Sequence, residues 1–280
     1  MISHAESVPA LRALTYLAPG IPREFFELVT AHLSAALGLQ IQLDADCRSS
    51  GPMHGDPDPF AEGRADIGFL CSPSYLYLQG QKRPSVELVP AGFVFADARH
   101  AGEPLYFSEV VVRKDHHAQC FSDLDGAVWG YNDECSLSGY FSTLQELATR
   151  GRDKGFFGRW VKTGSHLTSI ESTLAGSIDG AAIDSVALSI LMRERPDLRE
   201  RLRIVESFGP FPIQPVVLGS GLARSLKQCI AHALLELGPD MSTRLSRFGL
   251  ERCLPIDDRA YEEERRALAS LQWDRRCTVQ

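Results

Sequence analysis

The sequence predicts an α/β protein of two similar lobes, each a mostly parallel sheet flanked by helices, with a ligand cleft between the lobes. One observation behind this prediction is the alternation of short apolar segments with amphipathic helical segments, which is typical of βαβ units. The other is a repeat, because a G-x-x-D sequence leads into a strand-like segment at residues 63–69 and again at residues 176–182. Ligands of such sheets bind beyond the carboxyl ends of the strands, where loops lead into helices.

The first βαβ unit occupies residues 11–70. A strand is expected over residues 11–18, followed by a helix between Pro22, which suits a first helical turn, and Gly38, which suits a helix stop. Further strands are expected over residues 39–43 and 67–70.

The same order returns in the second half of the chain. The expected elements are a strand over 126–132, a helix over 138–150 that stops at Gly151, a helix over 168–175 and a strand over 180–183.

Two extended segments, 105–112 and 204–218, are expected to cross between the lobes. The C-terminal helical segments, 222–237 and 242–271, then return to the first lobe. The resulting division assigns residues 1–112 plus 212–280 to lobe one and residues 113–211 to lobe two.

Charge and hydropathy exclude two classes of protein. The chain of 280 residues carries 36 acidic and 29 basic side chains, a net charge of −7, and therefore has no positive field to attract nucleic acid. It also has no run of the roughly 20 apolar residues that a membrane-spanning helix needs. We expect neither nucleic-acid binding nor a membrane-spanning segment.

Cysteine usage and the N-terminus bear on localisation. The seven cysteines are odd in number and form no C-x-x-C pair, which argues against a disulfide framework. Residues 1–9 lack the basic and apolar regions of a secretory signal. The sequence as written therefore predicts a cytoplasmic protein, or a periplasmic one if a leader has been removed.

The best candidate site is the segment Ser136-Leu137-Ser138-Gly139-Tyr140, which we call the anion loop. It leaves a predicted strand and opens a helix, where backbone N–H groups without intrahelical partners favour an anion. The alternative is an ordinary serine N-cap that satisfies its own helix.

Two further residues stand at the starts of predicted helices. His166 follows Gly164-Ser165 and could donate to an anionic oxygen, although a lone histidine can also be a packed core residue. Asp184 follows the strand 180–183 and could accept from a protonated ligand oxygen or an amine. Its alternative role is to cap the helix that begins near Val186.

Several motifs in this order resemble the phosphonate-binding family of periplasmic solute receptors, which are type II, transferrin-like binding proteins that serve ABC importers. The motifs are Tyr106-Phe-Ser108, Asp123-Leu-Asp-Gly126, Ser136-Leu-Ser138-Gly139-Tyr140, Gly164-Ser165-His166, the run from Gly176 to Ser185, and Asp66 to Tyr75. The resemblance covers residues 11–250 approximately.

The resemblance implies a two-lobed receptor that holds a tetrahedral oxyanion. In this reading Ser136 and Ser138 match the family's S-T-S loop, with Leu137 in place of the middle hydroxyl. His166 matches the G-S-H histidine, Tyr75 a first-lobe tyrosine, and Asp184 an acidic position that faces the ligand. Cys71 stands where the family usually has glycine, and Tyr106 is expected near the hinge. The implied ligand-binding set is Tyr75, Ser136, Leu137, Ser138, Gly139, Tyr140, His166 and Asp184.

Other chemistry has less support. Cys135 precedes a helix start but has no histidine near it in sequence, and the His54 and His116 segments lack a complete set of metal ligands. There is no G-x-S-x-G sequence and no P-loop. We expect no catalytic residue, metal or cofactor.

Two functions remain open on the sequence. The first is a receptor for a small phosphonate-like or phosphate-like oxyanion, which serves an ABC permease or works inside the cell. The alternative is a cytoplasmic enzyme on the same fold, a lyase or a cofactor-precursor synthase, with Asp184 or His166 as general acid or base.

Overall fold

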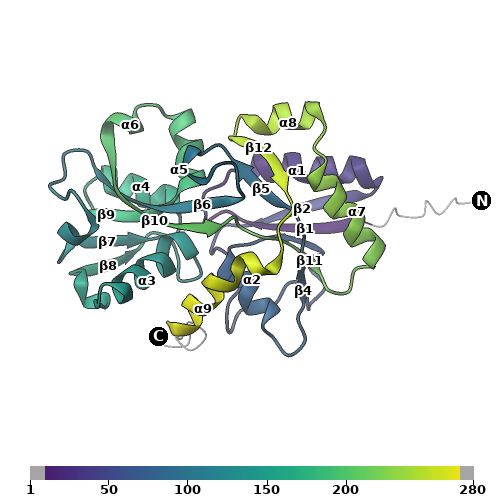
Figure 1. The fold of residues 1–280 in the computed structure, drawn as a ribbon, viewed down its shortest axis with the longest axis horizontal. Coiled ribbons are helices and arrows are strands. Elements are labelled where there is room, and N and C mark those ends of the chain that lie inside the picture. Colours follow the sequence, from purple (N-terminus) through teal and green to yellow (C-terminus); the bar gives the residue numbers. More distant parts are fainter. Residues whose placement is uncertain (1–9, 272–280) are drawn as a thin grey trace, which may run out of the picture.

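The computed structural model describes residues 10–271. Its two main sheets lie side by side, each with its own helices, and they form the two lobes (Figure 1). Lobe one contains the five-stranded sheet in the order β2 (Gln40–Asp46), β1 (Ala10–Tyr16), β3 (Ile67–Phe69), β11 (Val216–Gly219) and β4 (Val86–Leu88).

The sheet of lobe two also has five strands. Their order is β10 (Leu202–Pro212), β6 (Leu105–Arg113), β9 (Gly180–Asp184), β7 (Val128–Tyr131) and β8 (Arg159–Lys162).

The α/β class and the two-lobed architecture predicted from the sequence are confirmed. In lobe one β1 runs parallel to β2 and β3, and in lobe two β7 runs parallel to β8 and β9. However, β11 and β6 each run antiparallel to both neighbours, so the sheets are mixed. The carboxyl ends of the parallel strands carry the loops expected to hold a ligand.

Helix α1 (Arg23–Leu37) follows its sequence signals closely. Pro22 precedes its first residue, and Gly38 ends it in the left-handed region at φ 64°, with its N–H donating to the carbonyl of Ser34. Its buried face, which includes Phe25 and Val29, belongs to the core of lobe one.

The other helices complete the two lobes. Lobe one also contains α2 (Ser72–Gln79), α7 (Arg224–Leu235), α8 (Pro239–Ser246) and α9 (Glu262–Ser270), and lobe two contains α3 (Ser142–Thr149), α4 (His166–Leu174), α5 (Ser185–Glu194) and α6 (Leu198–Arg201). Helices α7 and α8 contact α1, and α9 contacts α2. Within residues 10–271, no helix combines the length and the apolar character that crossing a bilayer requires.

The C-terminal region differs from the helical prediction. Residues Leu250–Leu254 form strand β12, which pairs antiparallel with β5 (Gly92–Phe95). The apolar residues Leu250, Cys253 and Leu254 have helical spacing, but their partner strand lies about 155 residues earlier in the chain. A tertiary pairing of this kind overrides a local pattern.

The chain passes from lobe one to lobe two at β6 and returns after β10. These two strands pair with each other in the sheet of lobe two. Residues 213–215 then lead directly into β11 of lobe one. The lobe boundaries at residues 112 and 212 stay a prediction.

Candidate functional site

The anion loop lies between β7 and α3, at the carboxyl end of β7. Residues Leu137–Phe141 form a π-helical turn, which continues into α3. The loop is inside the protein, since Ser136, Leu137, Ser138 and Gly139 are buried. It faces lobe one instead of an open groove, as the following contacts show.

Ser138 and His166 are joined in the interior. The Ser138 hydroxyl lies 3.0 Å from Nε2 of His166, and both side chains are buried. The carbonyl of Ser138 accepts hydrogen bonds of 2.7 Å from the hydroxyls of Ser108 and Ser142. Two elements distant in sequence, β6 and α4, therefore fix the centre of the loop.

His166 is a neutral imidazole in this environment. Burial lowers its pKa to about 3. The amide of Asp184 donates to Nε2 at 3.4 Å, which places the ring proton on Nδ1. Nδ1 has no hydrogen-bond partner among residues 10–271, so His166 offers an unused neutral donor inside the protein.

Asp184 takes the capping role that the sequence left as an alternative. Its Oδ1 accepts from the amides of Val186 at 2.8 Å and Ala187 at 3.1 Å, at the start of α5. Its Oδ2 accepts from the Gln214 side-chain amide. Burial raises its pKa to about 7, although these hydrogen bonds act in the opposite direction.

Gly139 is required by close packing. A Cβ at this position would overlap Oδ1 of Asn132 and lie 3.1 Å from Cε1 of His166. The loop can approach these two side chains only because residue 139 has none.

The backbone amides of Leu137 and Gly139 in the anion loop both have hydrogen-bond partners within the protein. The hydroxyl of Ser136 accepts from the N–H of Gly139 at 3.0 Å, as in an ordinary N-cap. The N–H of Leu137 donates across the cleft to Sγ of Cys71 at 3.3 Å. The Leu137 side chain packs in the core cluster of lobe one.

The two lobes are also joined next to the loop by Asp133. Its buried carboxylate accepts from the Ser50 hydroxyl at 2.6 Å, from Asn132 Nδ2 at 3.0 Å and from the Cys135 amide at 2.9 Å. Burial raises the pKa of Asp133. A further hydrogen bond between the lobes, of 3.1 Å, runs from the backbone N–H of His166 to the backbone carbonyl of Ala18.

We expect Ser50→Ala to loosen this junction. The Asp133 carboxylate would lose its shortest donor but keep the others, which predicts a loss of about 1 kcal/mol in the free energy of unfolding. Urea unfolding measures the loss, and small-angle scattering should show a larger radius of gyration. Ser49→Ala removes a neighbouring hydroxyl without an interlobe bond and should leave both quantities unchanged. An equal effect of the two variants would contradict the assignment.

The hydroxyls of Tyr75 and Tyr140 form hydrogen bonds with residues away from Ser138 and His166. The Tyr75 hydroxyl donates to Asp258 at 2.5 Å, and its ring packs against Tyr261. Tyr140 packs against Tyr131 and Trp160, and its hydroxyl bonds to Lys154. Neither side chain forms a hydrogen bond with Ser138, His166 or Asp184 in the described part of the chain.

Two residues outside the sequence-derived ligand set join the site. Gln214, from the segment between β10 and β11, bonds to Asp184. Tyr106 on β6 is fully buried, and its hydroxyl has no hydrogen-bond partner among the described residues. Tyr106 lies two residues before Ser108, so the two side chains share a face of β6. The only sequence signal for Gln214 is its place between Pro212 and Pro215, in the segment expected to cross between the lobes.

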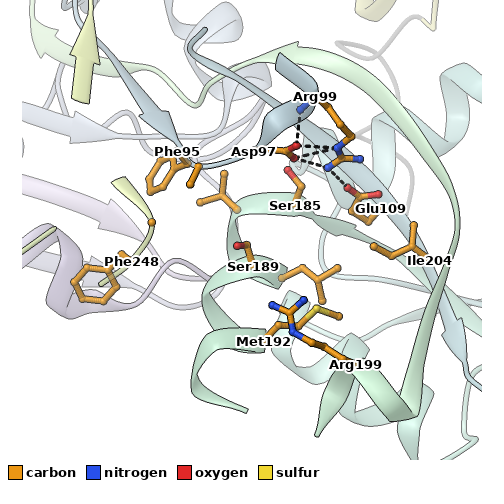
Figure 2. Close-up of a pocket in the computed structure, with 14 residues that line it drawn as sticks. Phe95, Asp97, Arg99, Glu109, Ser185, Ser189, Met192, Arg199, Ile204 and Phe248 are labelled. Atoms are coloured by element: carbon orange, nitrogen blue, oxygen red, sulfur yellow. Dashed lines mark hydrogen bonds and ion pairs between the residues drawn. The ribbon is translucent and has the colours of Figure 1, made fainter. Parts of the chain in front are cut away.

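The opposite face of β6 is fixed by Arg99. Its guanidinium pairs with the buried Glu109 at 2.6 Å, bonds to Ser207 of β10 at 3.1 Å and stacks over Phe107. Arg99 and Glu109 lie at one end of a separate cavity of about 150 Å³, which Ser185, Met192 and Phe248 also line (Figure 2). Arg99 therefore holds β10 against β6, the strand that carries Tyr106 and Ser108.

A larger cavity of about 630 Å³ lies beside the interlobe junction. Lobe one contributes Tyr16, Arg48 and Asp56, and lobe two contributes Asp133 and Lys162. Asp133, Glu134 and Cys135, which line it, directly precede the anion loop in the chain. In the part of the chain that is described, no group of three or more His, Cys, Asp or Glu side chains is arranged to hold a metal ion.

Comparison with protein families gives one match. Residues 23–261 match the model of a family described as the phosphonate periplasmic substrate-binding protein of ABC transporters. No curated protein matches the sequence.

Solved structures share the fold at low sequence identity. A binding-protein component of an ABC phosphonate transporter from Pseudomonas aeruginosa superimposes with a TM-score of 0.78 at 17% identity, over 96% of this chain and 88% of that one. PhnD1 from Prochlorococcus marinus in complex with methylphosphonate gives 0.77 at 16% identity, over 94% and 98% of the two chains. XAC2383 from Xanthomonas citri bound to ATP gives 0.65 at 17% identity, over 96% and 99%.

Proposed function

Because this chain belongs to the family of phosphonate periplasmic substrate-binding proteins of ABC transporters, we propose that it binds a small phosphonate-like or phosphate-like oxyanion between its lobes and delivers it to an ABC permease. We propose the periplasm as its place in the cell, on the same ground. The enzyme alternative has no support from the comparisons, and both carboxylate oxygens of Asp184 are engaged in structural hydrogen bonds.

The observation that carries the proposal is a pair of buried polar groups without partners. Nδ1 of His166 and the hydroxyl of Tyr106 are both fully buried, and neither has a hydrogen-bond partner among residues 10–271. A buried donor without a partner costs about 1–3 kcal/mol, so such groups are usually kept for a ligand or an ordered water. We propose that the oxyanion accepts from both groups when it is bound.

The recognition that we propose uses neutral donors. No lysine or arginine forms a hydrogen bond or ion pair with Ser138, His166 or Tyr106 in the described part of the chain. Nδ1–H of His166 and the Tyr106 hydroxyl would donate to the oxyanion. The Ser138 hydroxyl donates to Nε2 of His166 and would hold the imidazole in this tautomer. Closure of the lobes excludes water, which strengthens each of these bonds.

We expect calorimetry to detect binding of at least one anion among methylphosphonate, aminoethylphosphonate, phosphate, phosphite and sulfate. Ser138→Ala should weaken the bound anion's affinity roughly tenfold, because His166 loses the hydroxyl that donates to Nε2 and orients its Nδ1–H. Ser246→Ala removes an exposed serine of α8 and should not change the affinity. No binding of any of these anions, or equal affinity in Ser138→Ala, would refute the proposed site.

A further inference from the structure

The Leu137 amide, the first of the π-helical turn in the anion loop, already has a partner, and that partner comes from the other lobe. The N–H of Leu137 donates to Sγ of Cys71 at 3.3 Å, and the Cys71 side chain is 3% exposed. Cys71 immediately precedes α2, with an extended backbone at φ −73° and ψ 148°. Its own amide donates to the carbonyl of Ser50 at 3.0 Å, so the residue is held in place.

The thiol is a poor replacement for an anionic oxygen. Burial keeps the pKa of Cys71 well above its usual value, so the sulfur stays protonated and uncharged. A neutral thiol is a weak acceptor, whereas an amide at a helix start bonds strongly to an oxyanion. The Leu137 amide is therefore occupied by a soft, largely apolar atom.

This sulfur lies near one of the two unused donors, the Tyr106 hydroxyl. The hydroxyl of Tyr106 is buried without a partner, and Cys71 is the first of the ionisable neighbours that raise its pKa. Through the Leu137 amide, Cys71 also contacts the loop that carries Ser138. A ligand that reaches Tyr106 and Ser138 would meet the sulfur.

We propose that Cys71 is a specificity-determining residue, whose sulfur denies the Leu137 amide to a ligand oxygen and thereby favours a phosphonate over phosphate or sulfate. This inference rests on the proposed function. All four oxygens of phosphate or sulfate require donors or water when the lobes close. A phosphonate has three oxygens, and its carbon substituent can lie against the sulfur without losing a hydrogen bond.

The test compares two ligands in three proteins. Calorimetry gives the affinities of wild type, Cys71→Ala and Cys71→Ser for methylphosphonate and for phosphate. Cys71→Ala frees the Leu137 amide and should raise the affinity for phosphate roughly tenfold, with a change of about threefold or less for methylphosphonate. In Cys71→Ser the hydroxyl still accepts from the amide, and the affinity for phosphate should rise by less than about threefold.

The ratio of the two affinities separates selectivity from general damage to the fold. Cys253→Ala removes another buried thiol of lobe one, in β12, and should leave the ratio unchanged. A wild-type ratio retained in Cys71→Ala would overturn the role of Cys71 and leave the proposed function intact. If neither wild type nor Cys71→Ala bound methylphosphonate or phosphate, this inference would fail, and the proposed function would fail as well if the other three anions also did not bind.

Discussion

Gly139→Ala should disable the anion loop. The added Cβ would overlap Oδ1 of Asn132 and approach Cε1 of His166 at 3.1 Å. Both neighbours are fully buried and Asn132 Nδ2 is bonded to Asp133, so the added methyl group must displace a packed side chain. Overpacking of this kind costs about 1–3 kcal/mol in the free energy of unfolding. Displacement of Ser138 from His166 should also weaken oxyanion binding. A loss of similar size in the binding free energy corresponds to a decrease in affinity of about tenfold to 100-fold.

Urea unfolding and calorimetry measure these two effects separately. Gly221→Ala is the matched control, because its Cβ would meet no atom within 4 Å and its backbone is not in the left-handed region. The control should keep the wild-type affinity and stay within about 0.5 kcal/mol of its stability. If Gly139→Ala behaved like Gly221→Ala, the close packing around residue 139 would not be what shapes the loop.

The parts of the fold that the sequence predicted well depend on local signals. Helix α1 lies between Pro22 and Gly38 as expected, and the strands before and after it are close to their predicted bounds. The prediction of helix where strand β12 lies was wrong, because this strand forms by pairing with β5. Local spacing carries no information about a partner that is distant in the sequence.

The predictions for the candidate site likewise succeeded where the signal was local and failed where it was not. Sequence spacing indicated Ser136 as an N-cap and Asp184 as a cap of α5, and both caps are present. It could not reveal that the Leu137 amide bonds to Cys71, or that Asp133 joins the lobes through Ser50. These bonds arise only when the two lobes meet, and no motif within one lobe specifies them. The sequence also could not reveal that burial keeps His166 neutral.

Acidification should destabilise the protein through His166. Its pKa is about 3 in the folded protein, against 6.5 ordinarily. Between these values the unfolded chain binds a proton that the folded protein does not, so stability falls as the pH falls. At pH 4.5, two units below the ordinary pKa, the loss is about 3 kcal/mol. His166→Asn lacks this group, and the stability of wild type relative to the variant should drop by that amount between pH 7.5 and 4.5.

Asp184 provides a control, because its titration should change the stability in the opposite direction as the pH falls. Its pKa rises from 3.8 to about 7 on folding, so between these values the folded protein binds the extra proton. The stability of wild type relative to Asp184→Asn should therefore increase by about 3 kcal/mol from pH 7.5 to 4.5. Urea unfolding of the three proteins across this range yields both differences. Parallel pH profiles for wild type and His166→Asn would mean that the imidazole becomes charged inside the folded protein, and that water or an anion already reaches Nδ1.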